Sequence, residues 1–384
     1  MASQSKLEGL ITLSRIPDDC PTRNASAKSG TPQPSPSLGE RPLSWSLVVA
    51  TLHREECLLR SLRANVQQSR PPKQVIVVDA SADWQRVRKR ALREIAPATP
   101  GVEWIYVGSA RRSLPYQRNR GLDLCTSDVI FYLDDDAFMY RDCAEKMMRI
   151  YESDSRQEIG GVSAALAPAH ENRIGPLPAA ETNKTPLWKG MLFALWDQER
   201  LFLPYDGGYH QRPLSTEQQQ QGLVPRSLFH GCRMTFRTSA VRAVGGSDEV
   251  LLRTAFGEDC DLSYRVSRQH ALVMEPSALL FHEQTPVART KRALNTTLVL
   301  LNAVALYCLH APAGRRRRSR ILGFLSKRLA LDAVRDGMRG RLNVPCARGA
   351  LRALRHVPAL LKLDPETLRR EYEKLQIQLC DAPL

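Results

Sequence analysis

Four short apolar segments alternate with helical patterns in the first third of the chain, and this alternation constrains the fold more than any other feature of the sequence. The apolar segments lie at 45–50, 74–78, 102–107 and 129–133. The helical patterns between them lie at 58–66, 83–95 and 115–125. Strands that alternate with helices in this way are typical of a parallel sheet with helices on both faces. The sequence therefore predicts an α/β domain.

Acidic side chains follow two of the predicted strands at the point where each strand ends. Asp134, Asp135 and Asp136 follow the fourth strand, and Asp79 follows the second. Because the carboxyl ends of parallel strands meet at one edge of a sheet, we expect these acids to converge where open α/β folds bind ligands. Carboxylate oxygens are also ligands for divalent cations. The structural alternatives are a solvated acidic turn for the triple Asp and a helix cap or turn for Asp79.

Two further pairs of residues carry candidate chemistry. Arg118 and Asn119 lie in the predicted helix before the fourth strand and offer guanidinium and amide donors to a phosphate group. Glu258 and Asp259 precede a helix predicted from Asp261 to about Gln269. Acids at this place ordinarily cap a helix, but a carboxylate there could also deprotonate a hydroxyl nucleophile.

A single histidine is a candidate metal ligand. His282 directly follows a strand predicted at 278–281, and another strand is predicted at 229–236. A neutral imidazole beyond such a strand could complete a metal site, although a lone histidine is more often structural.

Three regions of the chain differ in composition. Residues 1–43 are rich in Ser, Pro, Thr and Gly, which predicts a disordered tail. Residues 44–288 contain the predicted strands and the candidate site residues, with an irregular stretch between about 167 and 225. Residues 289–384 show basic helical patterns. Within them polar residues interrupt the apolar segment Ala293–Leu309, so we expect a buried helix or one lying on a bilayer surface rather than a membrane span.

Charge and cysteine content narrow the functional classes. The chain has 384 residues and a net charge of +15, and much of the excess lies after residue 285. This charge favours anionic partners such as nucleotides, phospholipid surfaces or nucleic acid. Nine cysteines without a CxxC pair indicate neither a disulfide framework nor a zinc site, so we expect reduced thiols in the cytoplasm. The N-terminal segment lacks the pattern of a signal peptide, which argues against secretion.

An ordered set of motifs runs through residues 45 to 285, and the set is more specific than any one of its members. The motifs are Val77-Val78-Asp79-Ala80-Ser81, Arg118-Asn119-x-Gly121, Leu133-Asp134-Asp135-Asp136, Gly231-Cys232-x-Met234-x-Phe236, Gly245-Gly246-x-Asp248-Glu249, Gly257-Glu258-Asp259-x-Asp261-Leu262-x-x-Arg265 and Phe281-His282-Glu283. In this order they resemble the inverting family 2 glycosyltransferases of GT-A fold. The resemblance implies a Rossmann-like, mostly parallel mixed sheet flanked by helices over residues 44–288, followed by a helical C-terminal extension.

The resemblance also implies an activity and roles for individual residues. It implies a metal-dependent transfer of a sugar from a nucleotide-sugar donor to an acceptor hydroxyl, with inversion at the anomeric carbon and a Mg or Mn ion as cofactor. The two outer acids of the DxD motif would bind the ribose and the diphosphate-bound ion. We assign catalysis to Asp259 and Glu258, donor binding to Asp79, Arg118, Asn119, Asp134 and Asp135, and metal binding to Asp136 and His282.

The sequence also gives expectations for the acceptor and for the cellular location of the enzyme. The chain lacks a QxxRW motif and a bundle of membrane spans, so a single addition to a glycan, a lipid-linked acceptor or a polysaccharide precursor is expected rather than processive synthesis. The basic segment Arg289–Arg320 predicts a cytoplasmic enzyme held peripherally at an anionic membrane surface, or else a solvated helix packed on the catalytic domain.

Two other functions compete with glycosyl transfer. A nucleotidyltransferase also pairs a nucleotide with metal-binding acids, but it needs a Gly-rich phosphate loop, and none follows Trp45–Ala50. A nucleic-acid-binding protein would fit the pI of about 9.6, although no stacking-aromatic motif accompanies the arginines.

Overall fold

The computed structural model describes residues 42–168, 202–253, 255–283, 291–338 and 340–381. Residues 1–41 of the predicted N-terminal tail and residues 169–201 of the irregular stretch lie outside the described residues. The part from Pro42 onward forms one compact unit.

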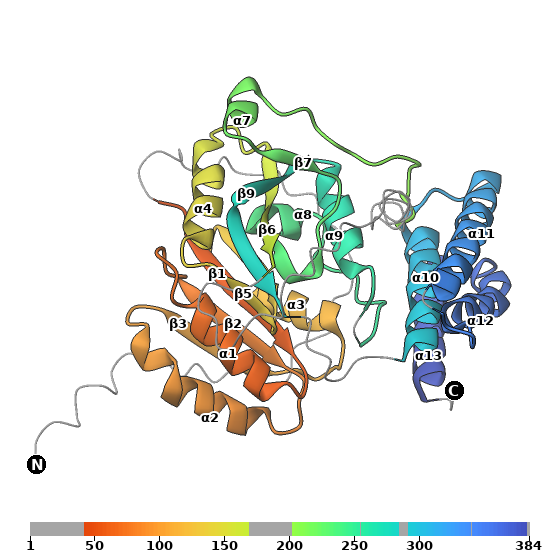
Figure 1. Cartoon of the computed structure of the whole chain (residues 1–384), viewed down its shortest axis with the longest axis horizontal. Coiled ribbons are helices and arrows are strands. Elements are labelled where there is room, and N and C mark those ends of the chain that lie inside the picture. Colours follow the sequence, from red (N-terminus) through yellow and green to blue (C-terminus); the bar gives the residue numbers. More distant parts are fainter. Residues whose placement is uncertain (1–41, 169–201, 254, 284–290, 339, 382–384) are drawn as a thin grey trace, which may run out of the picture. The chain divides into compact units, whose positions relative to one another are not determined.

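A single mixed sheet organises this unit (Figure 1). Its strands are β1 (Trp45–Thr51), β2 (Gln74–Asp79), β3 (Glu103–Gly108), β4 (Val129–Asp134), β5 (Ala137–Met139), β6 (Ile159–Ala167), β7 (Val224–Arg226), β8 (Met234–Arg237) and β9 (Ala271–His282). The order is β3-β2-β1-β4-β8-β6-β9-β5, with β7 paired to β9. The four strands expected from the alternating pattern are β1 to β4, and they are parallel to one another. β8 joins them antiparallel to β4, so the sheet is mostly parallel on one side and mixed on the other.

Helices cover the sheet, and a helical region follows it. The helices between strands are α1 (Glu55–Asn65), α2 (Trp84–Glu94), α3 (Leu114–Leu124), α4 (Cys143–Ser153), α7 (Thr216–Gln220), α8 (Thr238–Ala243) and α9 (Glu258–Ser267), with short 3₁₀ turns at Ala96–Ala98 and Gly231–Arg233. The C-terminal helices are α10 (Arg292–His310), α11 (Arg315–Met338), α12 (Pro345–Leu360) and α13 (Pro365–Asp381). The predicted α/β class with a C-terminal helical extension is confirmed.

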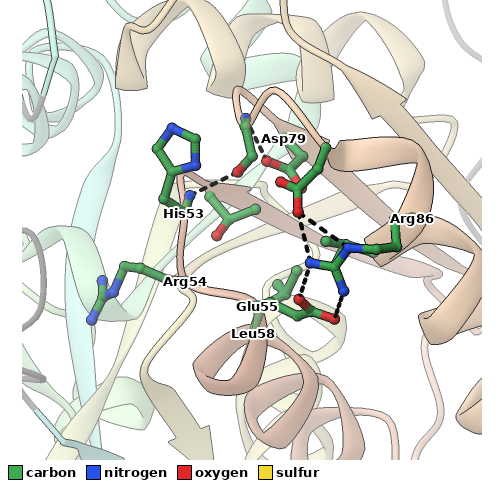
Figure 2. A pocket seen from close by; sticks show the side chains of 10 residues that line it. His53, Arg54, Glu55, Leu58, Asp79 and Arg86 are labelled. Atoms are coloured by element: carbon green, nitrogen blue, oxygen red, sulfur yellow. Dashed lines mark hydrogen bonds and ion pairs between the residues drawn. The ribbon is translucent and has the colours of Figure 1, made fainter.

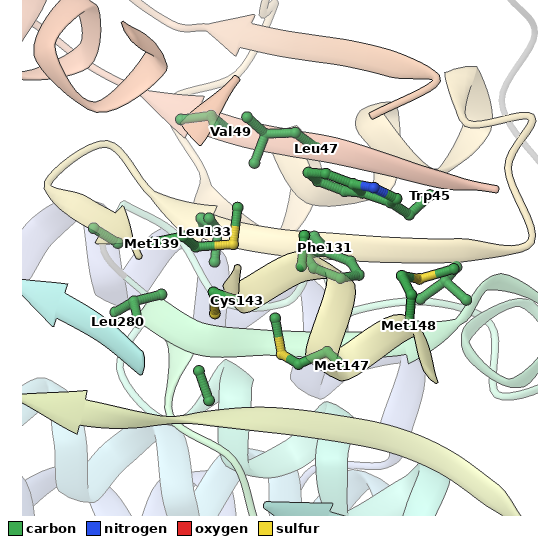
Figure 3. Close-up of a cluster of buried hydrophobic side chains, with 14 of the residues drawn as sticks. Trp45, Leu47, Val49, Phe131, Leu133, Met139, Cys143, Met147, Met148 and Leu280 are labelled. Atoms are coloured by element: carbon green, nitrogen blue, oxygen red, sulfur yellow. The ribbon is translucent and has the colours of Figure 1, made fainter. Parts of the chain in front are cut away.

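The central strands are buried on both faces because their side chains alternate between two apolar layers. Leu47 and Val49 of β1 belong to one layer, and Val48 belongs to the other. Figure 3 shows part of the first layer, where Trp45 and Phe131 from neighbouring strands pack with ring centroids 4.4 Å apart. Burial of both faces explains why these strands read as continuous apolar runs.

The helix α10 is the centre of a third apolar cluster, which joins the C-terminal helices to the segments around Tyr205 and Leu251. It is the one described helix long and apolar enough to cross a membrane, yet 67% of its apolar window is buried in protein. Of the two alternatives for Ala293–Leu309, a buried helix and a helix on a bilayer surface, the burial of α10 therefore favours the buried helix.

The sequence predictions were less accurate in the second half of the sheet. The strand predicted at 229–236 begins only at Met234, after a 3₁₀ turn. β6 was not predicted, because it consists largely of Gly and Ala rather than β-branched residues. Gly161 has a packing reason: a Cβ atom there would lie 2.6 Å from the ring of Phe229. The irregular stretch also contains α7 and β7.

Candidate functional site

The acids that end β2 and β4 lie at the same edge of the sheet. Thr51 at the end of β1 pairs with Asp79, and the preceding Ala50 pairs with Asp134. Only the end of β1 separates the two acids, so their backbones are roughly 10 Å apart. The convergence expected from the parallel topology is therefore present.

Asp134, Asp136 and His282 form a group that could hold a metal ion. One ligand atom from each lies within 4.8 Å of the others. The pairing of β5 with β9 places His282 opposite Ala137, and its Nε2 atom lies 3.0 Å from Oδ1 of Asp136. Two carboxylates and an imidazole suit Mn²⁺ or Mg²⁺ in chemistry and in spacing, so the residues fit the expected cofactor.

Arg54 binds Asp136 of this group and the neighbouring Asp135, and it was not predicted as a site residue. Its Nη2 atom donates to Asp136 Oδ2 at 2.6 Å, and its Nη1 atom lies 2.6 Å from Asp135 Oδ1. The hydroxyl of Thr51 donates to the other oxygen of Asp135 at 2.7 Å. Asp135 is thereby fixed by hydrogen-bond donors from two side chains of the protein. This arrangement favours a role for Asp135 in positioning Arg54 over direct contact with a sugar-donor molecule. No short-range pattern reveals Arg54, because its partners lie about eighty residues away in the sequence.

Burial and charge act in opposition on the acids. Burial raises the pKa of Asp134 above its ordinary value and the pKa of Asp135 to about 7. Burial alone would also raise the pKa of Asp136, but hydrogen bonds from His282 and Arg54 outweigh it and lower that pKa. Burial alone would lower the pKa of His282, but its bonds with Asp136 and Cys232 raise the pKa to about 10. The cationic partners thus outweigh burial only at Asp136, whose negative charge is stabilised by His282 and Arg54.

A cavity of about 210 Å³ opens beside Asp79 (Figure 2). Its lining includes His53, Arg54 and Arg86. Asp79 itself is 1% exposed; it accepts hydrogen bonds from the backbone of Ser81 at 2.8 Å and from the hydroxyl of Tyr106 at 2.6 Å. Both the turn-forming alternative and a ligand-facing position thus have structural support. Since Arg54 lines this cavity and also binds Asp136, the cavity adjoins the metal group.

Arg118 joins the two halves of the site from the interior. It is 2% exposed, forms an ion pair with Glu258, and places Nη2 3.1 Å from Asp134 Oδ1. Nη2 also donates to the carbonyl of Gly231 at 2.9 Å. Burial raises the pKa of Glu258 to about 7, against the opposing charge of Arg118. With its donors used inside the protein, Arg118 is better placed to position acids than to contact a phosphate.

Asp259 differs from its neighbour Glu258 in being only half-buried. Its Oδ2 atom accepts a hydrogen bond from the backbone N–H of Gly231 at 2.9 Å. The preceding Gly257 has φ of 92°, a conformation that favours glycine, and this turn begins α9 with Glu258 pointing inward. Asp259 therefore combines a fixed orientation with access from outside.

Asn119 lies next to Arg118 but serves another segment. Its amide donates to the carbonyl of Ser247 at 2.9 Å and to Glu249 at 2.8 Å, and its Oδ1 accepts from the Ser247 backbone at 2.8 Å. These bonds favour a role in holding the loop after Gly246 over the predicted contact with a donor phosphate.

The C-terminal helices hold the same loop, which leads to Glu258 and Asp259. Asp248 accepts hydrogen bonds from His310 of α10 and Arg369 of α13, the latter at 2.6 Å. Gln376 of α13 donates to the carbonyl of Val250 at 2.8 Å and accepts from the backbone of Leu252 at 2.9 Å. The sequence motif around Asp248 is therefore anchored by residues that sequence analysis placed in a separate region.

Comparison with protein families shows the family of this chain. The model of glycosyl transferase family 2 matches residues 46–244, just over half of the chain. The chain belongs to glycosyl transferase family 2. The matched range contains Asp79 and Asp134 to Asp136 and ends before Glu258 and Asp259. The family 2 transferase has the GT-A fold that the motifs implied.

Three solved structures are similar to this family 2 transferase. The mannosyltransferase PcManGT from Pyrobaculum calidifontis, in complex with GDP-Man and Mn²⁺, is 15% identical over 88% of this chain and 85% of that chain, with a TM-score of 0.49. S. aureus TarS 1-349 in complex with UDP-GlcNAc is 11% identical over 88% and 91%, with a TM-score of 0.48. GalNAc-T7 with UDP, GalNAc and Mn²⁺ is 14% identical over 71% and 48%, with a TM-score of 0.47. No sequence among the curated proteins matches the chain.

Proposed function

We propose that this glycosyltransferase moves a sugar from a nucleotide-sugar donor to an acceptor hydroxyl with inversion at the anomeric carbon. The observation that carries the proposal is the arrangement of acids around Arg118: Asp134 on the donor side and Glu258 with Asp259 on the other. Family membership favours glycosyl over nucleotidyl transfer.

Asp259 is the proposed general base. Its half-buried carboxylate would take the proton of the acceptor hydroxyl while the acceptor oxygen forms a bond to the anomeric carbon. The bond from that carbon to the diphosphate oxygen breaks, and the nucleoside diphosphate leaves with the electron pair. The N–H of Gly231 holds the carboxylate in place, and Glu258 stays behind it, paired with Arg118.

The donor is proposed to lie between the cavity at Asp79 and the group of Asp134, Asp136 and His282. Asp79 and the cavity would receive the nucleoside, and the three-residue group would hold a divalent cation. A bound Mn²⁺ or Mg²⁺ supplies charge stabilisation for the diphosphate as it departs. Arg54 lies where its guanidinium could pair with diphosphate oxygens once it leaves Asp136.

The acceptor and the cellular location are also parts of the proposal. A single addition to a glycan, a lipid-linked acceptor or a polysaccharide precursor suits a half-buried base that is open to solvent. A peripheral position on the cytoplasmic side of a membrane agrees with the basic C-terminal region. The contact with the membrane would be made by a surface other than α10, because α10 is mostly buried.

Release of nucleoside diphosphate from a panel of nucleotide-sugars, with Mn²⁺ or Mg²⁺ added, tests the proposed reaction. We expect release that requires the cation and one class of donor, and an inverted anomeric configuration in the product by NMR. Release of pyrophosphate would instead indicate nucleotidyl transfer. Turnover that survives both Asp136→Ala and Asp259→Ala would contradict the residue assignments.

A further inference from the structure

The charge of the C-terminal helices is distributed with a sharp asymmetry. From Lys291 to Leu363 the sequence contains only two acids, Asp332 and Asp336. Both are 0% exposed: Asp332 lies beside Arg328, and Asp336 accepts hydrogen bonds from the backbone at the start of α12. The described surface of α10, α11 and α12 therefore presents no acidic side chain.

Basic side chains cover the same helices. Those that are exposed on α11 and α12 are Arg316, Arg318, Lys327, Arg348 and Arg355. Acidic side chains return with Asp364, just before α13, and on α13 itself, where Glu373 pairs with Arg111 at 2.7 Å and Asp381 pairs with Arg253 at 3.2 Å. The acids of the region are thus either buried or lie at or beyond Asp364, and the cationic surface belongs to α11 and α12.

Exposed apolar side chains gather on these two helices and the connection between them. Six of the eight large apolar side chains that are exposed in the described residues belong here: Leu322, Val334, Met338, Leu342, Val344 and Leu351. Leu342 is 98% exposed and Leu322 is 57% exposed. Small residues separate them on α11, and Cβ atoms added at Gly323 and Gly337 would meet nothing within 4 Å. Each of these six side chains is open to solvent in the described part of the chain.

A cationic surface with protruding apolar side chains has the chemistry of a lipid-contacting surface. Arg and Lys bind anionic headgroups, while Leu, Val and Met side chains enter the boundary with the acyl chains. Proteins that bind single-stranded nucleic acid add aromatic side chains on which bases stack, and the exposed apolar residues of this surface include no aromatic ring. The observations favour a membrane over a nucleic acid.

We propose that α11, α12 and the part of their connection at 340–344 form a surface that binds the anionic face of a lipid bilayer. The surface differs from the segment Arg289–Arg320 expected from the sequence, because α10 is buried and the apolar contact is made by exposed residues further along the chain. Each basic residue close to an anionic bilayer strengthens binding on the order of fivefold. The proposal is independent of the reaction that the site catalyses.

Co-sedimentation of the full chain with lipid vesicles tests this surface. Vesicles of phosphatidylcholine alone are compared with an equimolar mixture of phosphatidylcholine and phosphatidylglycerol, at low and at high salt. We expect the protein to sediment with the anionic vesicles, and less of it to do so at high salt. It should not sediment with the neutral vesicles. Failure to bind the anionic vesicles overturns the proposal.

Paired charge reversals separate this surface from general charge effects. Arg348→Glu with Arg355→Glu, both exposed on α12, should weaken vesicle binding at least about tenfold. The control, Arg370→Glu with Lys374→Glu on α13, makes the same change in net charge at exposed positions and should leave most of the binding. Equal loss in both variants would overturn the assignment of the surface.

A single apolar variant and a competition experiment complete the test. Leu342→Ser removes a side chain that makes little contact within the protein, so folding should be unchanged in circular dichroism while vesicle binding falls several-fold. Tight binding of RNA that excludes vesicles, unaffected by Leu342→Ser, would show that the surface binds nucleic acid instead. Turnover of the nucleotide-sugar donor, measured without vesicles, should be the same in the native chain and in all these variants. If the native chain shows no turnover, that result argues against the proposed reaction and not against the membrane surface.

Discussion

Arg118 and Glu258 form an ion pair inside the family 2 site, with only 2% of the arginine and 3% of the glutamate exposed to solvent. They lie 140 residues apart in the sequence. The same guanidinium reaches Asp134 and the carbonyl of Gly231, so one buried cation connects Asp134 to the segment that holds Asp259. The relative placement of Asp134 and Asp259 therefore depends on Arg118.

Replacement of Arg118 by methionine should damage both stability and turnover. The change leaves Glu258 and Asp134 without their cation, and removal of one partner from a buried ion pair costs about 3–5 kcal/mol. Glu258→Gln should cost less, because an amide oxygen can still accept a hydrogen bond from Arg118. Urea unfolding and donor turnover measure the two effects. Arg120→Met, at a half-buried position on the same helix, is the control; an equal loss there would contradict the central role of Arg118.

Metal binding should respond in opposite directions to two substitutions. His282→Ala removes a ligand of the proposed group and should weaken Mn²⁺ binding at least about tenfold. Arg54→Gln removes the cation that competes for Asp136, so Mn²⁺ should bind several-fold more tightly in the absence of nucleotide. Electron paramagnetic resonance of Mn²⁺ with the nucleotide-free protein measures the affinity of both variants for the ion. Loss of affinity in Arg54→Gln would show that Arg54 supports the metal group rather than opposing it.

The attachment of the C-terminal helices should be sensitive to acid. Burial alone would raise the pKa of Asp248, but hydrogen bonds from His310 and Arg369 outweigh it and lower that pKa. An acid with a lowered pKa in the folded state contributes stability that is complete above its unfolded pKa and is lost as the pH falls toward the lowered value. The protection of α13 amides against hydrogen exchange, relative to their intrinsic rates, should therefore fall as the pH drops through and below the ordinary range of Asp titration, and less so in Asp248→Asn. An identical acid response in that variant would remove Asp248 as the cause.

The pair Arg369 and Arg370 offers a matched test of the same attachment. Arg369 binds the nearly buried carboxylate of Asp248, whereas Arg370 approaches only the partly exposed Glu371 at 3.8 Å. Arg369→Ala should lower the free energy of unfolding by about 1–2 kcal/mol and reduce turnover, because the loop before Glu258 loosens. Arg370→Ala should change the free energy of unfolding by less than about 0.5 kcal/mol and should leave turnover nearly unchanged. Thermal unfolding with parallel donor turnover provides the comparison; similar effects in both would exclude the specific contact.

The predictable part of the fold was the part whose strands are buried on both faces. The strands β1, β2 and β4 were predictable from the local sequence, since each contains a largely apolar run that is bounded by turns. β6 and the start of β8 depend on distant partners: Gly161 is required because Phe229 packs against it, and this contact has no local signature. Sequence reasoning therefore succeeded for the first half of the sheet and lost accuracy in the second.

The same distinction applies to the site. The acids at strand ends were predictable, because parallel topology brings Asp79 and Asp134 to one edge regardless of detail. The partners that neutralise them were not, since Arg54 is eighty-two residues from Asp136 and no spacing rule connects them. Asn119 was assigned to the donor because its amide could donate to a phosphate group, and the structure shows that amide bound to the loop at Ser247. Sequence position thus located the acids but not the side chains that support them.

The central claim is that Asp259 faces the acceptor while Asp136 belongs to the donor and metal side of one site. Steady-state kinetics of Asp259→Asn and Asp136→Ala with the preferred nucleotide-sugar test it most directly. We predict that Asp259→Asn lowers kcat by about 10²–10⁴-fold with little change in the KM for the donor, whereas Asp136→Ala also abolishes tight binding of the nucleotide with Mn²⁺. Near-native kcat in Asp259→Asn, or unchanged nucleotide and Mn²⁺ binding in Asp136→Ala, would contradict the account.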